Sequence, residues 1–190
     1  MQASFLADKF ATALDYDQYL RTGTDEQRRR WKQVYDATSL TPRQIEVVNS
    51  FSRQMKLLAI SGIWCGDCVQ QLPLIERICE ANPAKLWLRI VDRDEHRDLA
   101  DLVRINAGDR VPMVLFLAED HEICAVFGDR TLARYRALAA KYLGAEACST
   151  AIFLPPQEEL AATLADWLNE IERVQWMLRL SARLRKLHGD

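Results

Sequence analysis

The chain has 190 residues, a size typical of one compact domain with extensions. Hydrophobic residues make up 49% of the sequence and charged residues 27%, with only 7 Gly and 6 Pro, which excludes disordered, collagen-like and linker-rich proteins. The 25 Lys and Arg nearly balance the 27 Asp and Glu, so the formal charge is only -2. This balance argues against a protein dedicated to nucleic-acid binding.

The amino-terminal twenty residues do not resemble a targeting signal. They contain Asp8, Asp15 and Asp17 and lack a basic start followed by an apolar segment, so no signal peptide is expected. The longest apolar stretch, at 111–118, is far shorter than the roughly 20 residues of a membrane-spanning helix. We therefore expect a soluble, cytoplasmic protein with neither nucleic acid nor membrane as a partner.

The first part of the chain has the spacing of apolar residues that is typical of helices. One helix is predicted over residues 5–20 and a second over residues 24–37. Thr41 precedes Pro42, which places a capping residue before a proline at the first helical position and predicts a third helix to about Phe51.

From residue 56 the pattern changes to alternating strands and helices. The run 56–61 is almost wholly apolar and ends at Gly62, which is typical of a strand buried on both faces of a sheet. Two β–α units followed by a hairpin predict a mixed sheet with helices on its faces. After the first strand, the predicted elements are a helix ending near Ala81, a strand at 86–92, a helix at 97–105, strands at 111–117 and 122–127, and a helix at 131–142.

A long amphipathic helix is predicted after Pro155 and Pro156. Its apolar stripe consists of Leu160, Leu164, Trp167, Leu168, Ile171, Val174 and Leu178. Such a helix could cover its own domain, form a homodimer or dock on a partner, whereas the acids and bases that share its polar face disfavour a membrane surface. With a possible cap at Gly144, the chain divides into a helical extension at 1–55, a core at 56–144, and a connection and C-terminal helix at 145–190.

Two of the five cysteines stand three positions apart, in Cys65-Gly66-Asp67-Cys68. At the start of a helix, the unpaired backbone amides favour a thiolate on Cys65, while Cys68 lies one turn deeper and keeps its proton. This division predicts that Cys65 attacks a disulfide and that Cys68 then resolves the mixed disulfide.

A pair of cysteines with this spacing is also half of many zinc sites. Cys79 lies about eleven residues further along the same helix, roughly 16 Å from Cys68, and no second pair completes a site. We therefore expect neither a metal nor a cofactor. The polar residues at 92–98 are interpreted as a solvated turn, Cys79 and Cys124 as core residues, and Cys148 as an exposed thiol that is either incidental or forms a regulatory or intermolecular disulfide.

The motif and its surroundings resemble the thioredoxin family. The Trp-Cys-Gly-Asp-Cys segment at 64–68 follows a buried strand and is similar to the family's Trp-Cys-Gly-Pro-Cys. Pro73 matches a proline in the family's active-site helix, Pro112 matches its cis-proline, and Gly128 matches a glycine near the end of the next strand. The resemblance covers about 56–143 and implies an α/β thioredoxin-like fold, with a central mixed sheet flanked by helices.

By this resemblance the protein is a thiol:disulfide oxidoreductase, supplied by an electron donor and acting on protein or small-molecule disulfides. Pro112 is then cis and faces the cysteines, and the backbone of Val111 pairs with an extended substrate. Trp64 borders the same groove, which Gly66 and Asp67 complete.

The sequence departs from the family pattern at two positions. Ala59 stands where thioredoxins usually have a buried aspartate that helps to move the proton of the resolving thiol. Asp67 replaces the usual proline, and its carboxylate is expected to raise the pKa of Cys65 and favour a more reducing couple, or to accept a proton in place of the missing acid. The alternative function is a non-catalytic module that binds a partner beside Pro112 or senses redox state.

Overall fold

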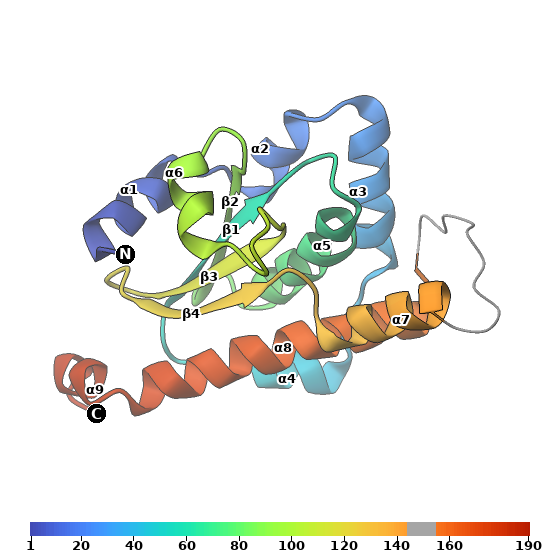
Figure 1. Cartoon of the computed structure of the whole chain (residues 1–190). Coiled ribbons are helices and arrows are strands. Elements are labelled where there is room, and N and C mark those ends of the chain that lie inside the picture. Colours follow the sequence, from blue (N-terminus) through green and yellow to red (C-terminus); the bar gives the residue numbers. More distant parts are fainter. Residues whose placement is uncertain (144–154) are drawn as a thin grey trace.

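The computed structural model describes residues 1–143 and 155–190. Its sheet has four strands in the order β2-β1-β3-β4, as Figure 1 shows. The central strand β1 runs parallel to β2 and antiparallel to β3, and β4 is antiparallel to β3. The expected mixed sheet flanked by helices is confirmed. The strands are β1 (Met55–Ser61), β2 (Leu86–Asp92), β3 (Met113–Ala118) and β4 (Ile123–Gly128).

Along the chain, helices lie before, between and after the strands of this sheet. Three of the early helices begin with reciprocal capping by a polar side chain and a glutamine three residues on, starting at Asp15, Thr24 and Thr41. The helices are α1 (Ala3–Thr12), α2 (Tyr16–Arg21), α3 (Asp25–Ala37), α4 (Pro42–Asn49), α5 (Gly66–Ala81), α6 (Arg97–Ala100), α7 (Leu132–Leu143), α8 (Gln157–Leu180) and α9 (Ala182–His188), with a 3-10 turn at Asp101–Val103.

The single helix expected at 5–20 is wrong, because the chain breaks between α1 and α2. Leu14 leaves the helix and exchanges two backbone hydrogen bonds with Ile90 of β2, at 2.9 and 2.8 Å. The N-terminal segment therefore adds a short bridge to the free edge of the sheet, and a new helix starts after Asp15.

The helix expected at 97–105 is also shorter than predicted. The α-helix ends at Ala100, and Asn106 and Ala107 take left-handed backbone angles, with φ of 48° and 56°. The strand expected from Val111 begins two residues later, at Met113. The other expected elements of the core agree with the structure to within a few residues, while the expected cap at Gly144 lies outside the described residues.

The helix α5 connects the first two strands and lies at the centre of the helical layer. It packs against α3 and α4 of the N-terminal extension and against α8 from the other end of the chain. Every residue from Cys68 to Ile75 is buried, including the polar Gln70 and Gln71. Both extensions thus cover the helix that carries the cysteine pair.

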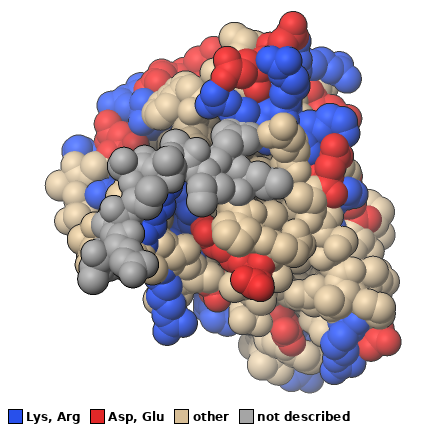
Figure 2. Space-filling view, turned by 90° about the vertical axis from the view of Figure 1, so that its right-hand side faces the viewer, with Lys and Arg blue, Asp and Glu red and all other residues tan. Residues whose placement is uncertain are grey.

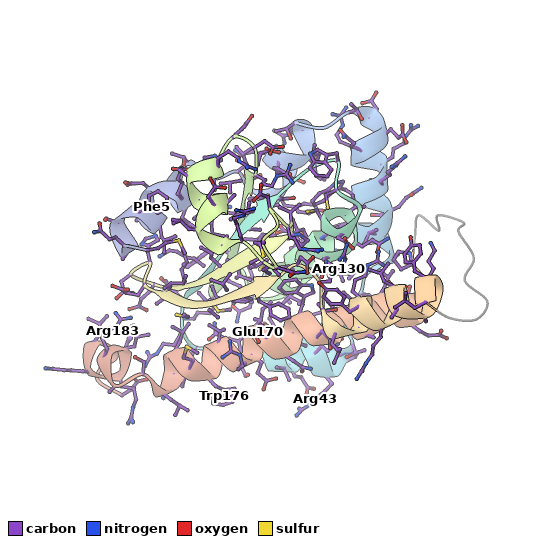
Figure 3. The ribbon with its side chains drawn as sticks, viewed as in Figure 1. Phe5, Arg43, Arg130, Glu170, Trp176 and Arg183 are labelled. Atoms are coloured by element: carbon purple, nitrogen blue, oxygen red, sulfur yellow. The ribbon has the colours of Figure 1, made fainter. Side chains whose placement is uncertain are left out.

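The C-terminal helix α8 covers its own domain, one of the three roles considered for it. Trp167 is fully buried, its ring meets Phe127 of β4 edge to face at 5.0 Å, and its Nε1 donates to Gln71 of α5 at 3.2 Å. Figure 3 shows Trp176 on the opposite side of α8, away from the sheet. A homodimer through this helix would have to use Trp176, Met177 and Leu180, which are exposed.

The surface gives no sign of a single dominant charge. Figure 2 shows acidic and basic side chains interspersed over one face of the molecule, around a region of uncharged side chains. Among the described residues, no helix is both long and apolar enough to cross a membrane.

Candidate active site

The cysteine pair lies where β1 turns into α5. Cys65 is the capping residue of the helix, with extended backbone angles, and its N–H donates to the carbonyl oxygen of Gly62 at 2.8 Å. Cys65 is partly exposed, whereas Cys68, one turn into α5, is fully buried. Both are free thiols in this structure. The turn therefore presents one sulfur to solvent and keeps the other behind it.

The two thiols have opposite pKa shifts. A hydrogen bond from Cys68 lowers the pKa of Cys65 to about 7, burial opposes this shift, and the backbone amides of Cys68 and Asp67 support it. Burial raises the pKa of Cys68 well above its ordinary value, and its interaction with Cys65 raises it further. At neutral pH the exposed sulfur is thus the one with substantial thiolate character.

Residues from the sheet complete the site opposite the cysteines. The Val111–Pro112 peptide bond is cis, as the resemblance implied, and the Cys65 thiol donates to the Val111 carbonyl oxygen at 3.7 Å. Gly128 of β4 lies against the same segment, since a Cβ there would be only 2.4 Å from the Pro112 carbonyl oxygen. The three sequence landmarks Cys65, Pro112 and Gly128 therefore meet at one place.

Trp64 and Gly66, predicted to contact the substrate, are exposed on either side of Cys65. The Trp64 side chain is 54% exposed, and the Arg93 guanidinium lies 5.0 Å from the centre of its ring. Val111 and Pro112, by contrast, are buried, so only their backbone is placed to contribute to a groove. The exposed rim around Cys65 thus consists of an aromatic ring and a glycine.

The charge of Asp67 acts to raise the pKa of Cys65, as expected, but its effect is small and its carboxylate is paired. Arg130 reaches one carboxylate oxygen at 2.6 Å and Arg134 the other at 3.2 Å. Figure 3 shows Arg130 at the connection between β4 and α7. With both oxygens held by guanidinium groups, Asp67 is poorly placed to accept a proton, and its charge is the least of the influences on the lowered pKa of Cys65.

These features agree with comparison to known proteins. A family model described as Thioredoxin matches residues 13–142, which is more than half of the chain. The protein belongs to the thioredoxin family. None of the curated proteins matches it.

Two solved structures share the fold of this thioredoxin-family protein. A protein of unknown function from Pseudomonas aeruginosa superimposes with a TM-score of 0.62 at 21% identity, covering 86% of this chain and 97% of that one. An HIV epitope scaffold superimposes with a TM-score of 0.61 at 20% identity, covering 86% of this chain and 96% of that one. At such identities the likeness concerns the fold alone. Both superpositions cover 86% of this chain, which is more than the segment of about 56–143 that resembles the thioredoxin family in sequence.

The thioredoxin domain contains site residues that sequence reasoning missed. Arg134 lies in α7 and Arg130 two residues before this helix begins, while their partner Asp67 lies more than sixty residues earlier. Arg134 also pairs with Glu159 of α8 at 2.6 Å. The spacing of the arginines was visible in the sequence, whereas their acidic partners depend on the tertiary fold.

The N-terminal extension also reaches the active-site turn. Trp31 of α3 is fully buried and donates its Nε1–H to the Ile63 carbonyl oxygen at 3.0 Å. This bond fixes the backbone two residues before Cys65. The N-terminal extension therefore helps to hold the backbone of the turn that carries Cys65.

The remaining candidates have structural explanations. Ala59 is fully buried in β1, so no carboxylate stands behind Cys68 at that position. Cys79 is buried and Cys124 is half-buried, while Cys148 lies outside the described residues.

In the polar turn at 92–98, Asp92 accepts the Asp94 backbone N–H at 2.8 Å. No group of His, Cys, Asp and Glu in the described part of the chain is arranged to hold a metal ion.

Proposed function

We propose that the protein is a thiol:disulfide oxidoreductase in which Cys65 is the nucleophile and Cys68 the resolving thiol. The observation that carries this proposal is the opposite character of the two sulfurs. One is accessible with a pKa lowered to about 7, and the other is buried with a raised pKa. A structural or idle cysteine pair has no need of this asymmetry, whereas a two-step exchange reaction requires it.

The reaction proceeds by two thiolate attacks. The Cys65 thiolate attacks one sulfur of a substrate disulfide, forming a mixed disulfide and releasing the other substrate sulfur as a thiolate. Cys68 then attacks the Cys65 sulfur, the bond to the substrate sulfur breaks, and the proton of Cys68 passes to the departing thiolate. The substrate gains two electrons and the enzyme is left with a Cys65–Cys68 disulfide, which an external dithiol donor reduces again.

We further propose that the net direction is reduction, in the cytoplasm. A pKa of about 7 at Cys65 equals that of thioredoxin, whose couple lies near -270 mV. Equilibration in glutathione or dithiothreitol buffers, with mass spectrometry to identify the joined cysteines, measures the potential directly. A two-electron transition near or below about -250 mV is expected. A potential close to that of an oxidant such as DsbA, at about -120 mV, would reverse the proposed direction.

Turnover of a model disulfide tests the assignment of the two cysteines. With dithiothreitol as donor and insulin as substrate, Cys65→Ser should abolish the catalysed rate. Cys68→Ser should accumulate a mixed disulfide, visible as a substrate adduct by mass spectrometry. Cys79→Ala is the matched control, because Cys79 is another buried cysteine of α5.

Two results would contradict the proposal. Full activity in Cys65→Ser would reject Cys65 as the nucleophile. The absence of any Cys65–Cys68 disulfide under oxidising buffers would instead favour a thioredoxin-fold module that binds partners without catalysis.

A further inference from the structure

The buried thiol of Cys68 must lose its proton to resolve a mixed disulfide, yet its environment opposes this. Burial raises the pKa of Cys68, and the groups that lower it are the Ser61 hydroxyl and the Gly62 backbone amide. Ala59 provides no carboxylate. The resolving thiol therefore depends on hydrogen-bond donors that stabilise its anion, and no acid–base residue is among them.

Ser61 is the last residue of β1 and is fully buried, and Tyr19 of α2 is almost fully buried. Within the part of the chain that the structure describes, neither hydroxyl oxygen has a hydrogen-bond partner. Ser61 nonetheless lies near enough to Cys68 and Tyr19 to lower the pKa of each, against the larger effect of burial, although neither hydroxyl makes a hydrogen bond of ordinary geometry among the described residues. Because an unsatisfied buried hydroxyl is costly, two of them beside a reactive thiol require an explanation.

The N-terminal extension holds Tyr19 in this position. Capping by Asp15 starts α2, and the Tyr19 ring meets Trp31 of α3 edge to face at 5.6 Å. Trp31 in turn donates to the carbonyl oxygen of Ile63, in the turn before Cys65. Tyr19 is therefore linked by side-chain contacts to the same turn that carries the nucleophile.

We propose that Ser61 and Tyr19 are positioning residues for the resolving step, a proposal that rests on the proposed function. As Cys68 loses its proton and attacks the Cys65 sulfur, Ser61 Oγ–H donates to the forming thiolate and Tyr19 Oη–H donates to Ser61 Oγ. The new bond joins the two cysteine sulfurs, the bond from Cys65 to the substrate sulfur breaks, and the departing substrate thiolate takes the proton. The two hydroxyls stabilise the anion and keep their own protons.

Dipyridyl disulfide separates the two steps in a single turnover. Attack by Cys65 releases a first pyridinethione, and resolution by Cys68 releases a second, both followed by ultraviolet absorbance. Ser61→Ala should slow the second release by about tenfold or more and shift its pH dependence upward, because a hydrogen bond to a charged group is lost. Tyr19→Phe should slow the same phase by a smaller factor. The first release should not change in either variant.

Tyr16→Phe is the matched control. Tyr16 is also a buried tyrosine of α2 whose hydroxyl has no partner among the described residues, but the groups that act on it are the side chains of Glu76, Tyr35, Asp17 and Glu80. This variant should leave both releases unchanged, and Ser61→Thr, which keeps a hydroxyl, should retain most of the second rate. Urea unfolding establishes that each variant is folded.

The outcomes are distinct. An unchanged second release in both Ser61→Ala and Tyr19→Phe would overturn the inference while leaving the two-cysteine reaction intact. Equal slowing by Tyr16→Phe would also overturn it, because the effect would then be structural. Failure of the unaltered protein to release a second pyridinethione would instead reject the proposed function.

Discussion

The guanidinium group of Arg130 lies 2.6 Å from the carboxylate of Asp67, one of the two residues between Cys65 and Cys68. This ion pair joins the connection after β4 to the first turn of α5, and the side chains of both partners are largely buried. An acid next to a nucleophilic thiolate would otherwise repel it. The arginine thus offsets part of the Asp67 charge, which raises the pKa of Cys65 less than the other influences lower it, so the net shift is downward, to about 7.

Removing this arginine should weaken the nucleophile. In Arg130→Ala the Asp67 charge is less compensated, so the pKa of Cys65 should rise from about 7 and its alkylation by iodoacetamide at neutral pH should slow by about threefold or more. The measurement is the alkylation rate of Cys65 as a function of pH. Because Arg134 still contacts Asp67, the double variant should show a larger effect.

Arg136→Ala provides the control for that experiment. Arg136 lies on α7, six residues after Arg130, and is exposed, so its substitution removes an equal charge without touching Asp67. A rise in the pKa of Cys65 that is equal in Arg136→Ala and Arg130→Ala would show that net charge, and not the ion pair, controls the thiol.

Gly128 should be irreplaceable on steric grounds. A Cβ at this position would lie 2.4 Å from the Pro112 carbonyl oxygen and 2.7 Å from the Met113 sulfur, so backbone has to move. Gly128→Ala should reduce the free energy of unfolding by about 2 kcal/mol or more, measured in urea. Gly66→Ala is the contrasting control, because no atom lies within 4 Å of the Cβ that alanine would add there. Equal stability of the two variants would contradict the proposed contact.

Much of the core could be predicted because its signals are local. The apolar run of β1 and the spacing of apolar residues in α5 depend on neighbours in sequence, and the capping residue Thr41 lies directly before its helix. The motif itself located the cysteines at the start of a helix. These predictions required no knowledge of which distant segments meet.

The predictions that failed depend on distant contacts. Leu14 leaves the helical path because Ile90 of β2 supplies hydrogen-bond partners at the sheet edge. The small size of the Asp67 effect was not predicted, because Arg130 and Arg134, which pair with its carboxylate, follow β4 in the chain. The role proposed for the Tyr19 hydroxyl has no recognisable signature in a helix of the extension, because it depends on the packing of Tyr19 against Trp31 of another helix.

Glu76 of α5 should make stability depend on pH. Burial raises its pKa from 4.5 to about 7, with Glu80, Asp17 and Asp15 adding to the shift. The folded state then binds more protons than the unfolded state between these values, so this group's contribution to stability is lost as pH rises from about 4.5 to about 7. Glu76→Gln should match the unaltered protein near pH 4 and exceed it by about 2–3 kcal/mol at pH 8.

The measurement is the free energy of urea unfolding at both pH values. Glu46→Gln, at an exposed glutamate of α4, serves as the control and should change stability by less than about 0.5 kcal/mol at either pH. An identical pH dependence in Glu76→Gln and the unaltered protein would mean that Glu76 is not held in its neutral form by the fold.

Substitution of Trp64 tests whether the exposed rim around Cys65 binds substrate. The test distinguishes an effect on substrate binding from an effect on stability. Its ring is 54% exposed next to Cys65, and Trp176 of α8 is 57% exposed on the side of that helix away from the sheet. Because both rings are largely in solvent, alanine at either position should change the free energy of unfolding by no more than about 0.5–1 kcal/mol. Only Trp64→Ala removes an aromatic surface beside Cys65. Only this variant should therefore raise KM for insulin, by about threefold to tenfold, because the contact between the Trp64 ring and the bound substrate is lost. A rise in KM of the same size in Trp176→Ala would place the substrate on a surface that includes α8, and an unchanged KM in Trp64→Ala would remove Trp64 from the binding site.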